Sequence, residues 1–529
     1  MKKQLFASVV LYTFALVSAF AQETTQANSF ELSDEAHHFV ATKTSFDKAP
    51  FHCMTDVTNK YIAYIFEENN NAFVLKHRIE VYDMDSNEKL WQLSFSPLTT
   101  SYEMTNFGLL EKKNDSSIRL YDYSTGTRLW KVNAPVCCGV FEDKVFVSTI
   151  SRNIWAHSLK DGKQLWKANL SFENGISTSY AIDPIHSFLA MDNLYKLNWE
   201  DGSYIKTDIK TAVTNKGALA GKIGGALLGA AVGVAIGGGG YFYYPIYTNS
   251  TITDRFTNAE LVLPANDMLN SGLSSNIIED NGKYYIADRK GIMSFDKDLN
   301  ILWETKHADE RASRSELTLV KGNLYLMNLG FGIKSGKAKK MGHAFVAGYK
   351  ASDGTQLFFK ELSDEKKMVL SVNIDEEKAC MLFDDAMSSV YFADNNVNTI
   401  QCDTTRYGAF EGFVNANEEF ICRDGQLQHI KDVIKTPAVY TTRGNVLEVS
   451  PTTGKLTELK SEGFYHIIGK CGKMTIIRGG EEDRELWCIE DGKATNLSNN
   501  ADKVWVKNYL VSVITHAGTS ILIHLDKTI

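Results

Sequence analysis

Several kinds of sequence signal are missing from this 529-residue chain, and each absence excludes a class of protein. The chain has 56 lysines and arginines against 64 aspartates and glutamates, a net charge of −8. A nucleic-acid-binding surface shows as a basic excess, so no nucleic-acid partner is expected. No H-E-x-x-H, G-x-S-x-G or EF-hand sequence occurs, and Gly336-Lys337 lacks the other residues of a P-loop. We therefore predict no catalytic residues, no metal site and no bound cofactor.

Cysteine is also sparse, with eight residues in the whole chain. No C-x-x-C sequence and no cysteine–histidine spacing of a structural zinc site is present. An even number permits disulfides in an oxidising compartment, but the sequence leaves their pairing open. Eight cysteines in so long a chain do not indicate a disulfide-stabilised scaffold.

The N-terminus has the pattern of a secretory signal peptide. Lys2 and Lys3 precede an apolar run over residues 5–17, and Ala19-Phe20-Ala21 supplies an A-x-A cleavage site. The alternative, an N-terminal membrane anchor, requires a longer apolar span. We therefore expect residues 1–21 to be removed and the protein to be exported, either to the periplasm or out of the cell.

A repeated pattern of strands and turns predicts an all-β fold. A strand ending near an aspartate, a polar turn and a second strand opening on Leu-Trp recur at Ile79–Trp91, Ile118–Trp130 and Ile154–Trp166. A period of about 40 residues with strand signals is typical of β-propeller blades, each made of about four strands. We predict a propeller of eight blades, with seven as the alternative number and two unrelated β domains as the alternative fold.

Weaker copies of the pattern extend along the chain. They begin at Leu194, Ile292, Val346, Val446 and Leu486. Asp-Gly and Thr-Gly pairs in their turns can supply the positive φ that tight hairpins require. We expect the aromatic residue after each turn to pack between neighbouring blades, with Trp91, Trp130, Trp166 and Trp303 as the blade-packing residues. Residues 22–206 and 251–529 would then form the two halves of the propeller.

These residues resemble the repeat of the pyrroloquinoline-quinone (PQQ) propeller family, in which a Leu-Asp strand end, a Thr-Gly-Lys turn and an apolar residue precede Trp. The resemblance is closest over 79–206 and 280–360, and it extends to the propeller subunit of the outer-membrane β-barrel assembly machinery, a partner-binding protein without chemistry. Family members close the ring with both chain ends in one blade. We therefore expect a strand over 38–44 to pair with strands near 509–516 and 520–525.

An adjacent cysteine pair carries the enzyme alternative. The resemblance implies that Cys137 and Cys138 could form a vicinal disulfide, because quinoprotein dehydrogenases of the family hold such a pair against the cofactor ring. The Arg-Gly stretch and the Glu/Asn/Asp calcium cluster of those enzymes are not recognisable in this sequence. The leading prediction is therefore a non-catalytic scaffold that binds a protein partner, and the alternative is a PQQ-dependent dehydrogenase or a degenerate relative.

Residues 207–250 interrupt the repeat. Glycines recur there every four residues, at Gly217, Gly221, Gly225, Gly229, Gly233 and Gly237. On a helix they share one stripe, where another backbone can approach closely. Residues 223–248 carry no charge and would span roughly 39 Å as a helix, enough to cross a bilayer.

We predict a helical Gly/Ala-rich insertion in which this glycine zipper, over 217–240, associates with a membrane or joins copies of the protein. Two alternatives stay open. The insertion could pack on the propeller, or the protein could be a membrane-active assembling factor that carries the propeller as a receptor-binding part.

Overall fold

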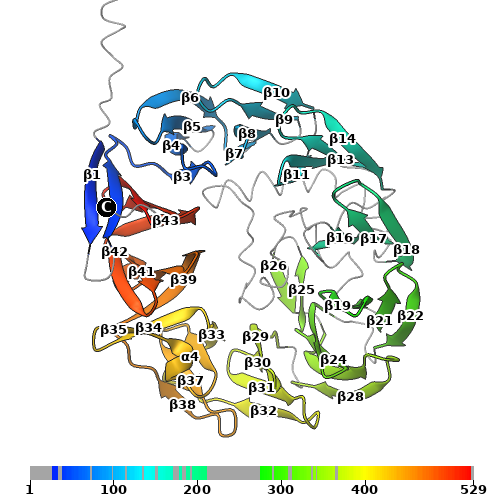
Figure 1. The fold of residues 1–529 in the computed structure, drawn as a ribbon. Coiled ribbons are helices and arrows are strands. Elements are labelled where there is room, and N and C mark those ends of the chain that lie inside the picture. The colour runs from blue at the N-terminus through cyan, green and yellow to red at the C-terminus, as the bar shows by residue number, and fades with distance from the viewer. Residues whose placement is uncertain are drawn as a thin grey trace, which may run out of the picture.

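The chain forms a ring of β-sheets in a computed structural model (Figure 1). The structure describes residues 27–33, 38–71, 74–97, 99–113, 116–133, 136–148, 153–170, 178–181, 186–190, 193–210, 275–288, 291–307, 313–334, 337–340, 342–363 and 367–525. Over these ranges the regular structure is β-strand, apart from the short helix α4 (Ile430–Val433) and the 3-10 turn η1 (Glu481–Asp483). The predicted all-β, propeller-like class is therefore confirmed.

Five four-stranded sheets follow one another in the first part of the ring. The first to third sheets contain β3 (His52–Thr55), β4 (Tyr61–Asn71), β5 (Val74–Asp83) and β6 (Lys89–Phe95); β7 (Thr100–Met104), β8 (Leu109–Lys113), β9 (Ser117–Tyr121) and β10 (Arg128–Val132); and β11 (Val136–Phe141), β12 (Lys144–Ser148), β13 (Asn153–Ser158) and β14 (Gln164–Asn169). The fourth and fifth contain β15 (Thr178–Ala181), β16 (His186–Ala190), β17 (Asn193–Asn198) and β18 (Tyr204–Lys210); and β19 (Ile278–Asp280), β20 (Lys283–Ala287), β21 (Gly291–Asp296) and β22 (Ile301–Lys306). Figure 1 shows the last strand of each sheet on the outside of the ring.

Five further sheets complete the ring. The sixth to eighth contain β23 (Ser315–Val320), β24 (Asn323–Asn328), β27 (Phe345–Lys350) and β28 (Gln356–Glu361); β29 (Ser371–Ile374), β30 (Lys378–Leu382), β31 (Ala386–Tyr391) and β32 (Val397–Gln401); and β33 (Phe410–Phe413), β36 (Ala438–Thr441), β37 (Val446–Val449) and β38 (Leu456–Glu458). The six-stranded ninth sheet contains β35 (Gln426–His429), β34 (Glu419–Arg423), β39 (Gly463–Cys471), β40 (Met474–Gly479), β41 (Glu485–Glu490) and β42 (Lys493–Ser498). The five-stranded tenth contains β43 (Ala501–Lys507), β44 (Leu510–Thr515), β45 (Ser520–His524), β2 (His38–Thr44) and β1 (Ala27–Ser33).

The number of sheets differs from the expected number of blades. The part of the chain that the structure describes forms ten sheets of four or more strands, so neither eight nor seven is confirmed. The eight copies of the pattern lie in the first to sixth, eighth and ninth sheets, whereas the seventh sheet, around β32, and the tenth sheet, which both chain ends form, contain none of them. Sheets of this kind form from alternating apolar residues and turns without the aromatic residue.

Both chain ends contribute to the tenth sheet, and this confirms the predicted closure. β2 pairs antiparallel with β45 from Val40↔His524 to Thr44↔Ser520, and β1 adds outside β2. Two lysines of β43 form hydrogen bonds that join this sheet to the first one. Lys503 Nζ donates to Phe51 O at 2.9 Å, and Lys507 Nζ donates to Thr55 O at 3.1 Å.

The core lies between successive sheets rather than inside one layer. Ile79 and Val81 of β5 are buried in one cluster with Tyr102 of β7, in the second sheet. Tyr82 points to the opposite side of β5, because side chains alternate along a strand. It joins a cluster with Leu510 and Leu522 of the tenth sheet. Each sheet therefore contributes one face to each neighbouring interface.

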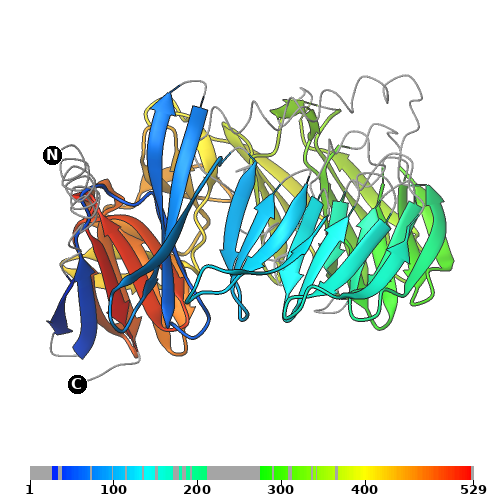
Figure 2. The ribbon, with the colours of Figure 1, turned by 90° about the horizontal axis from the view of Figure 1, so that it is seen from above.

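Two hairpins extend the second-to-third-strand connections. β4 and β5, with 11 and 10 residues, form a hairpin that rises above the neighbouring strands (Figure 2). β25 (Phe331–Lys334) and β26 (Lys337–Lys340) form a separate hairpin between β24 and β27. In Figure 1 this second hairpin lies inside the ring.

The predicted glycine zipper, Gly217 to Gly237, lies outside the described residues. β18 runs on to Lys210, four residues beyond the expected end of the first half at 206, and the description resumes at Ser275. Among the residues placed by the structure, no helix is long and apolar enough to cross a membrane.

Candidate functional site

Four tryptophans near the start of outer strands make the same contact with the following sheet. Each indole N–H donates to a main-chain carbonyl in the next sheet's turn: Trp91 to Tyr123 (2.6 Å), Trp130 to Leu159 (2.7 Å), Trp166 to Trp199 (3.2 Å) and Trp303 to Ala351 (3.1 Å). Trp130 is buried and the other three are half-buried. Each contact therefore joins two sheets by a hydrogen bond and by the apolar surface that the indole ring buries.

A glycine in each receiving turn makes room for the indole ring. Gly126, Gly162, Gly202 and Gly354 have φ between +67° and +75°. A Cβ on Gly162 would lie 2.9 Å from the ring of Trp130, and a Cβ on Gly202 would lie 2.5 Å from the ring of Trp166. The turn glycine thus serves two needs, since it permits the positive φ and leaves the space that the ring fills.

The sixth sheet makes an equivalent contact with different residues. Phe358 stands where the repeat elsewhere has tryptophan, and its ring has no N–H to donate. The hydroxyl of Tyr325, on β24, donates instead to Phe392 O at 3.2 Å and to Asn395 Oδ1 at 3.0 Å. Asn395 has φ +59° and takes the place of the turn glycine. The sequence pattern missed Tyr325 because this residue comes from another strand of the sheet.

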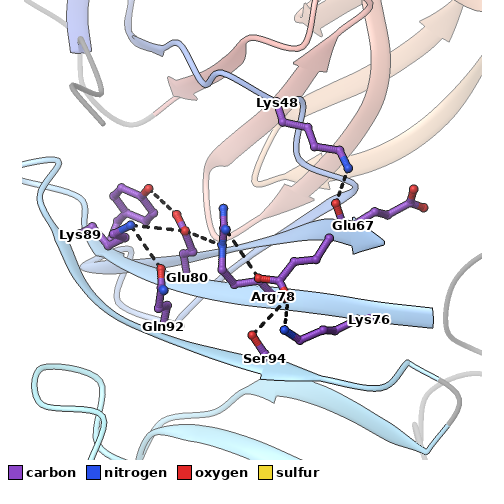
Figure 3. Close-up of polar contacts among 10 residues, drawn as sticks. Lys48, Glu67, Lys76, Arg78, Glu80, Lys89, Gln92 and Ser94 are labelled. Carbon is purple, nitrogen blue, oxygen red and sulfur yellow. Dashed lines mark hydrogen bonds and ion pairs between the residues drawn. The ribbon is translucent and has the colours of Figure 1, made fainter. Parts of the chain in front are cut away.

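A chain of charged contacts runs along the base of the β4–β5 hairpin (Figure 3). Its centre is Glu80, which is only 1% exposed. Glu80 Oε1 lies 2.7 Å from Arg78 Nε and 3.4 Å from Lys89 Nζ. Tyr82 OH donates to Glu80 Oε2 at 2.7 Å. A buried carboxylate with three such partners is compensated for the water it has lost.

The chain of contacts continues through Arg78 to Glu68. Arg78 Nη1 lies 3.6 Å from Glu68 Oε1, Lys76 Nζ lies 3.0 Å from Glu68 Oε2, and Ser94 Oγ donates to the same oxygen at 3.2 Å. Partial burial opposes ionisation of Glu68, but these partners, Lys76 first, hold the pKa of this carboxyl below its usual range. The base of the hairpin is therefore cross-linked by charge across β4, β5 and β6.

The second sheet has a comparable buried carboxylate. Glu111 of β8 is 7% exposed, and its Oε2 lies 3.0 Å from Arg119 Nη1. Tyr102 OH donates to Glu111 Oε1 at 3.1 Å. Burial, together with the charge of Glu111, raises the pKa of the Tyr102 hydroxyl, so this hydroxyl stays a donor at neutral pH.

The predicted cysteine pair lies in the innermost strand of the third sheet. β11 pairs Cys137 with Val147 and Gly139 with Phe146, so Cys138 is the extra residue of a β-bulge. The side chains of both cysteines lie outside the description. The six cysteines with described side chains are all free thiols: Cys53, Cys380, Cys402, Cys422, Cys471 and Cys488. Over the described ranges, no group of three or more His, Cys, Asp or Glu side chains could hold a metal ion.

One protein family matches part of the chain. The family described as "Outer membrane protein assembly factor BamB" matches residues 114–215, which include the second and third tryptophan repeats. These residues therefore carry propeller repeats like those of BamB. No curated protein matches the chain.

Three solved structures resemble the chain at low identity. The crystal structure of BamB from Moraxella catarrhalis is 10% identical, with a TM-score of 0.32 over 72% of this chain and 97% of that one. The computationally designed Ika8 protein is 8% identical, with a TM-score of 0.31 over 80% of this chain and 96% of that one. KlHsv2 with loop 6CD replaced by a Gly-Ser linker is 6% identical, with a TM-score of 0.29 over 78% and 98%.

Proposed function

We propose that the protein is an exported, non-catalytic propeller that binds a protein partner through the β4–β5 hairpin. The observation that carries the proposal is the height of this hairpin above the neighbouring strands combined with the charged contacts that stiffen its base (Figures 2 and 3). A rigid projection loses little conformational freedom when a partner binds, so more of the contact energy appears as affinity. Binding residues commonly sit on connections that a rigid scaffold positions.

The sequence at the end of the hairpin fits a protein partner better than a charged ligand. Residues 69–75 read Asn-Asn-Asn-Ala-Phe-Val-Leu and carry no charge, whereas Glu68 and Lys76 on either side are paired with each other. Amide and apolar side chains suit the polar and apolar mixture of a protein–protein interface. The charged pairs further down would keep the hairpin upright.

The test compares complexes formed by two versions of the exported protein in native extracts. One version lacks residues 70–74, which shortens the hairpin above the Glu68–Lys76 pair. The control carries Val57→Ser and Tyr509→Ser, which change exposed apolar residues elsewhere. We expect the parent and the control to co-purify with one stoichiometric partner and the shortened version to lose it while keeping its melting temperature. Retention of the partner by the shortened version would exclude the hairpin as the binding element.

The glycine-rich segment supplies the second part of the proposal, which is association with a membrane or with further copies through Gly217 to Gly237. Replacing Gly225, Gly229 and Gly233 by leucine blocks close backbone approach and raises hydrophobicity at the same time. If the stripe mediates specific packing, oligomers or membrane-bound assemblies disappear in sedimentation and flotation. If the segment is only an apolar anchor, membrane partitioning persists or increases. Parental behaviour of both this variant and a deletion of 215–248 would contradict any such role.

A further inference from the structure

One outer strand of the ring differs from the others in having a long and regular open edge. β1 is the fifth strand of the tenth sheet and lies outside β2. Among the strands that the structure describes, none pairs with the other edge of β1. Figures 1 and 2 show this strand at the outer margin of the ring. An edge of this kind presents a row of N–H and C=O groups with which another strand can pair.

Most of the other outer strands carry an irregularity that disturbs their edge. The pairing with the preceding strand shifts register at seven of them: β6, β10, β14, β18, β22, β28 and β42. β32 and β38 pair without a shift but have only five and three residues. β1 pairs regularly with β2 over all seven residues, from Ala27↔Thr44 to Ser33↔His38. Bulges, short length, lysine and proline keep sheet edges from associating, and β1 has none of these features.

The sequence of β1 suits pairing with a second copy of the same strand. An antiparallel pair centred on Phe30 uses all seven residues and places Phe30 opposite its copy in the second chain. This register sets Glu31, the one charged residue of the strand, opposite Ser29. A pair centred on Glu31 would instead oppose two carboxylates and leave Ala27 and Asn28 without a partner residue in the strand. Aromatic residues directly opposite each other stabilise a strand pair, whereas like charges in that position destabilise it.

We propose that β1 joins two copies of the protein edge to edge, so that two five-stranded sheets form one sheet of ten strands across a two-fold axis. Each copy uses the same edge, so the contact is closed and ends at a dimer. The tenth sheet extends one strand further out than the first eight sheets, which have four strands each. Two rings can therefore meet at β1 before their other outer strands come into contact. A seven-residue edge is a small interface, and the expected Kd is roughly micromolar.

Cysteine cross-linking of the full exported chain tests both the contact and its register. The test variant carries Phe30→Cys, the control carries Ser33→Cys on the same strand, and the parent shows any background from the native cysteines. In the proposed pair, the two copies of residue 30 have Cα atoms about 4.5–5.5 Å apart, within disulfide range, whereas the two copies of residue 33 lie roughly 20 Å apart. On mild oxidation we expect at least about tenfold more covalent dimer from Phe30→Cys than from Ser33→Cys.

A second pair of variants keeps Phe30 and serves if its replacement weakens the dimer. Residue 28 of one copy lies opposite residue 32 of the other in the proposed register. Asn28→Cys and Leu32→Cys should therefore cross-link when they are mixed, and neither should do so alone. Equal cross-linking of the mixture and of the separate variants would show random collision and would overturn the proposed register.

An exchange of charge at the two-fold axis measures the affinity. Phe30→Lys sets two ammonium groups opposite each other and should raise the Kd in sedimentation equilibrium about tenfold or more. Phe30→Glu should do the same, and an equimolar mixture of the two variants should recover the dimer because opposite charges then meet. The melting temperature of each variant checks that the ring still folds.

A parent that stays monomeric at every concentration, or equal cross-linking at positions 30 and 33, would overturn the proposal. A dimer that persists in both Phe30 variants but disappears on deletion of 215–248 would assign the association to the glycine-rich segment, and this also overturns pairing through β1. The version that lacks residues 70–74 should still dimerise. The proposal for β1 and partner binding by the β4–β5 hairpin therefore fail separately.

Discussion

A glycine-to-alanine substitution in a receiving turn tests the contact between neighbouring sheets, because the added methyl group would press on the tryptophan ring. In Gly162→Ala, the new Cβ would lie 2.9 Å from the ring of Trp130, at a residue whose φ is +70°. Two separate costs follow. An L-residue in left-handed backbone costs about 1–2 kcal/mol, and forcing extra volume into a packed contact costs about 1–3 kcal/mol. We therefore expect a total destabilisation of about 2–5 kcal/mol.

A substitution at a second glycine measures the cost of the left-handed backbone alone, without a steric clash. Gly322 has φ +79°, and a Cβ there would meet nothing within 4 Å. Gly322→Ala should therefore cost only the strain, about 1–2 kcal/mol. Trp130→Ala removes the ring and should itself cost about 3–5 kcal/mol. In that background, Gly162→Ala should cost no more than Gly322→Ala, because the clash has gone.

Urea unfolding followed by fluorescence gives the midpoint and slope for each single variant and for the double variant. The coupling between Gly162→Ala and Trp130→Ala should be about 1–3 kcal/mol, the size of the steric term. Equal costs for Gly162→Ala and Gly322→Ala, together with zero coupling, would show that the tryptophan does not press on the turn. The account of how the sheets are joined would then be wrong.

Four further predictions follow from other described contacts. Glu80→Gln should destabilise the protein by about 2 kcal/mol in urea unfolding, less than for a fully buried pair because Arg78 and Lys89 keep some contact with water; an unchanged midpoint would contradict this. Hydrogen bonds from Lys163 lower the pKa of Asp161 to about 2. The stabilisation by this carboxylate is therefore complete above its unfolded pKa of about 4 and is lost as the pH falls from about 4 through about 2. Over this pH range the melting temperature should fall more in the parent than in Asp161→Asn. Burial raises the pKa of the Cys53 thiol, and that of Cys402 to about 11, so a thiol reagent should label both only on unfolding, and native labelling would count against their burial. Purified protein with added PQQ and calcium should show no dye-linked dehydrogenase activity, and robust turnover would favour the enzyme alternative.

The local parts of the fold were predictable because they depend on neighbours in sequence. Alternating strands, Asp-Gly turns and the Leu-Trp position give the hairpins and place the tryptophan beside the next sheet. The pairing of 38–44 with the C-terminal strands was predictable as well, since a propeller must close and both ends carry strand patterns. The count of sheets was not predictable from the repeat, because the seventh sheet, around β32, keeps the strands and lacks the Leu-Trp pair that marks the pattern.

The candidate site was less accessible to sequence reasoning. Arg78 and Glu80 stand two residues apart on β5 and share a face with Tyr82, and nothing local shows that this face packs against the tenth sheet. Glu68 and Lys76 are eight residues apart and meet only because the long hairpin pairs β4 with β5. The charged contacts therefore depend on which strand face another sheet covers.

What the sequence by itself determined is the repeating unit, because strand period, turn chemistry and the tryptophan position are set within about 40 residues. What only the tertiary structure decided is how the units meet. The hydroxyl of Tyr325, on a different strand, replaces the missing indole N–H. β34 lies in sequence between two strands of the eighth sheet, but it pairs with β39 in the ninth. Both arrangements depend on contacts between residues distant in sequence. A buried carbonyl or sheet edge needs a hydrogen-bond partner, but it does not specify which residue supplies it.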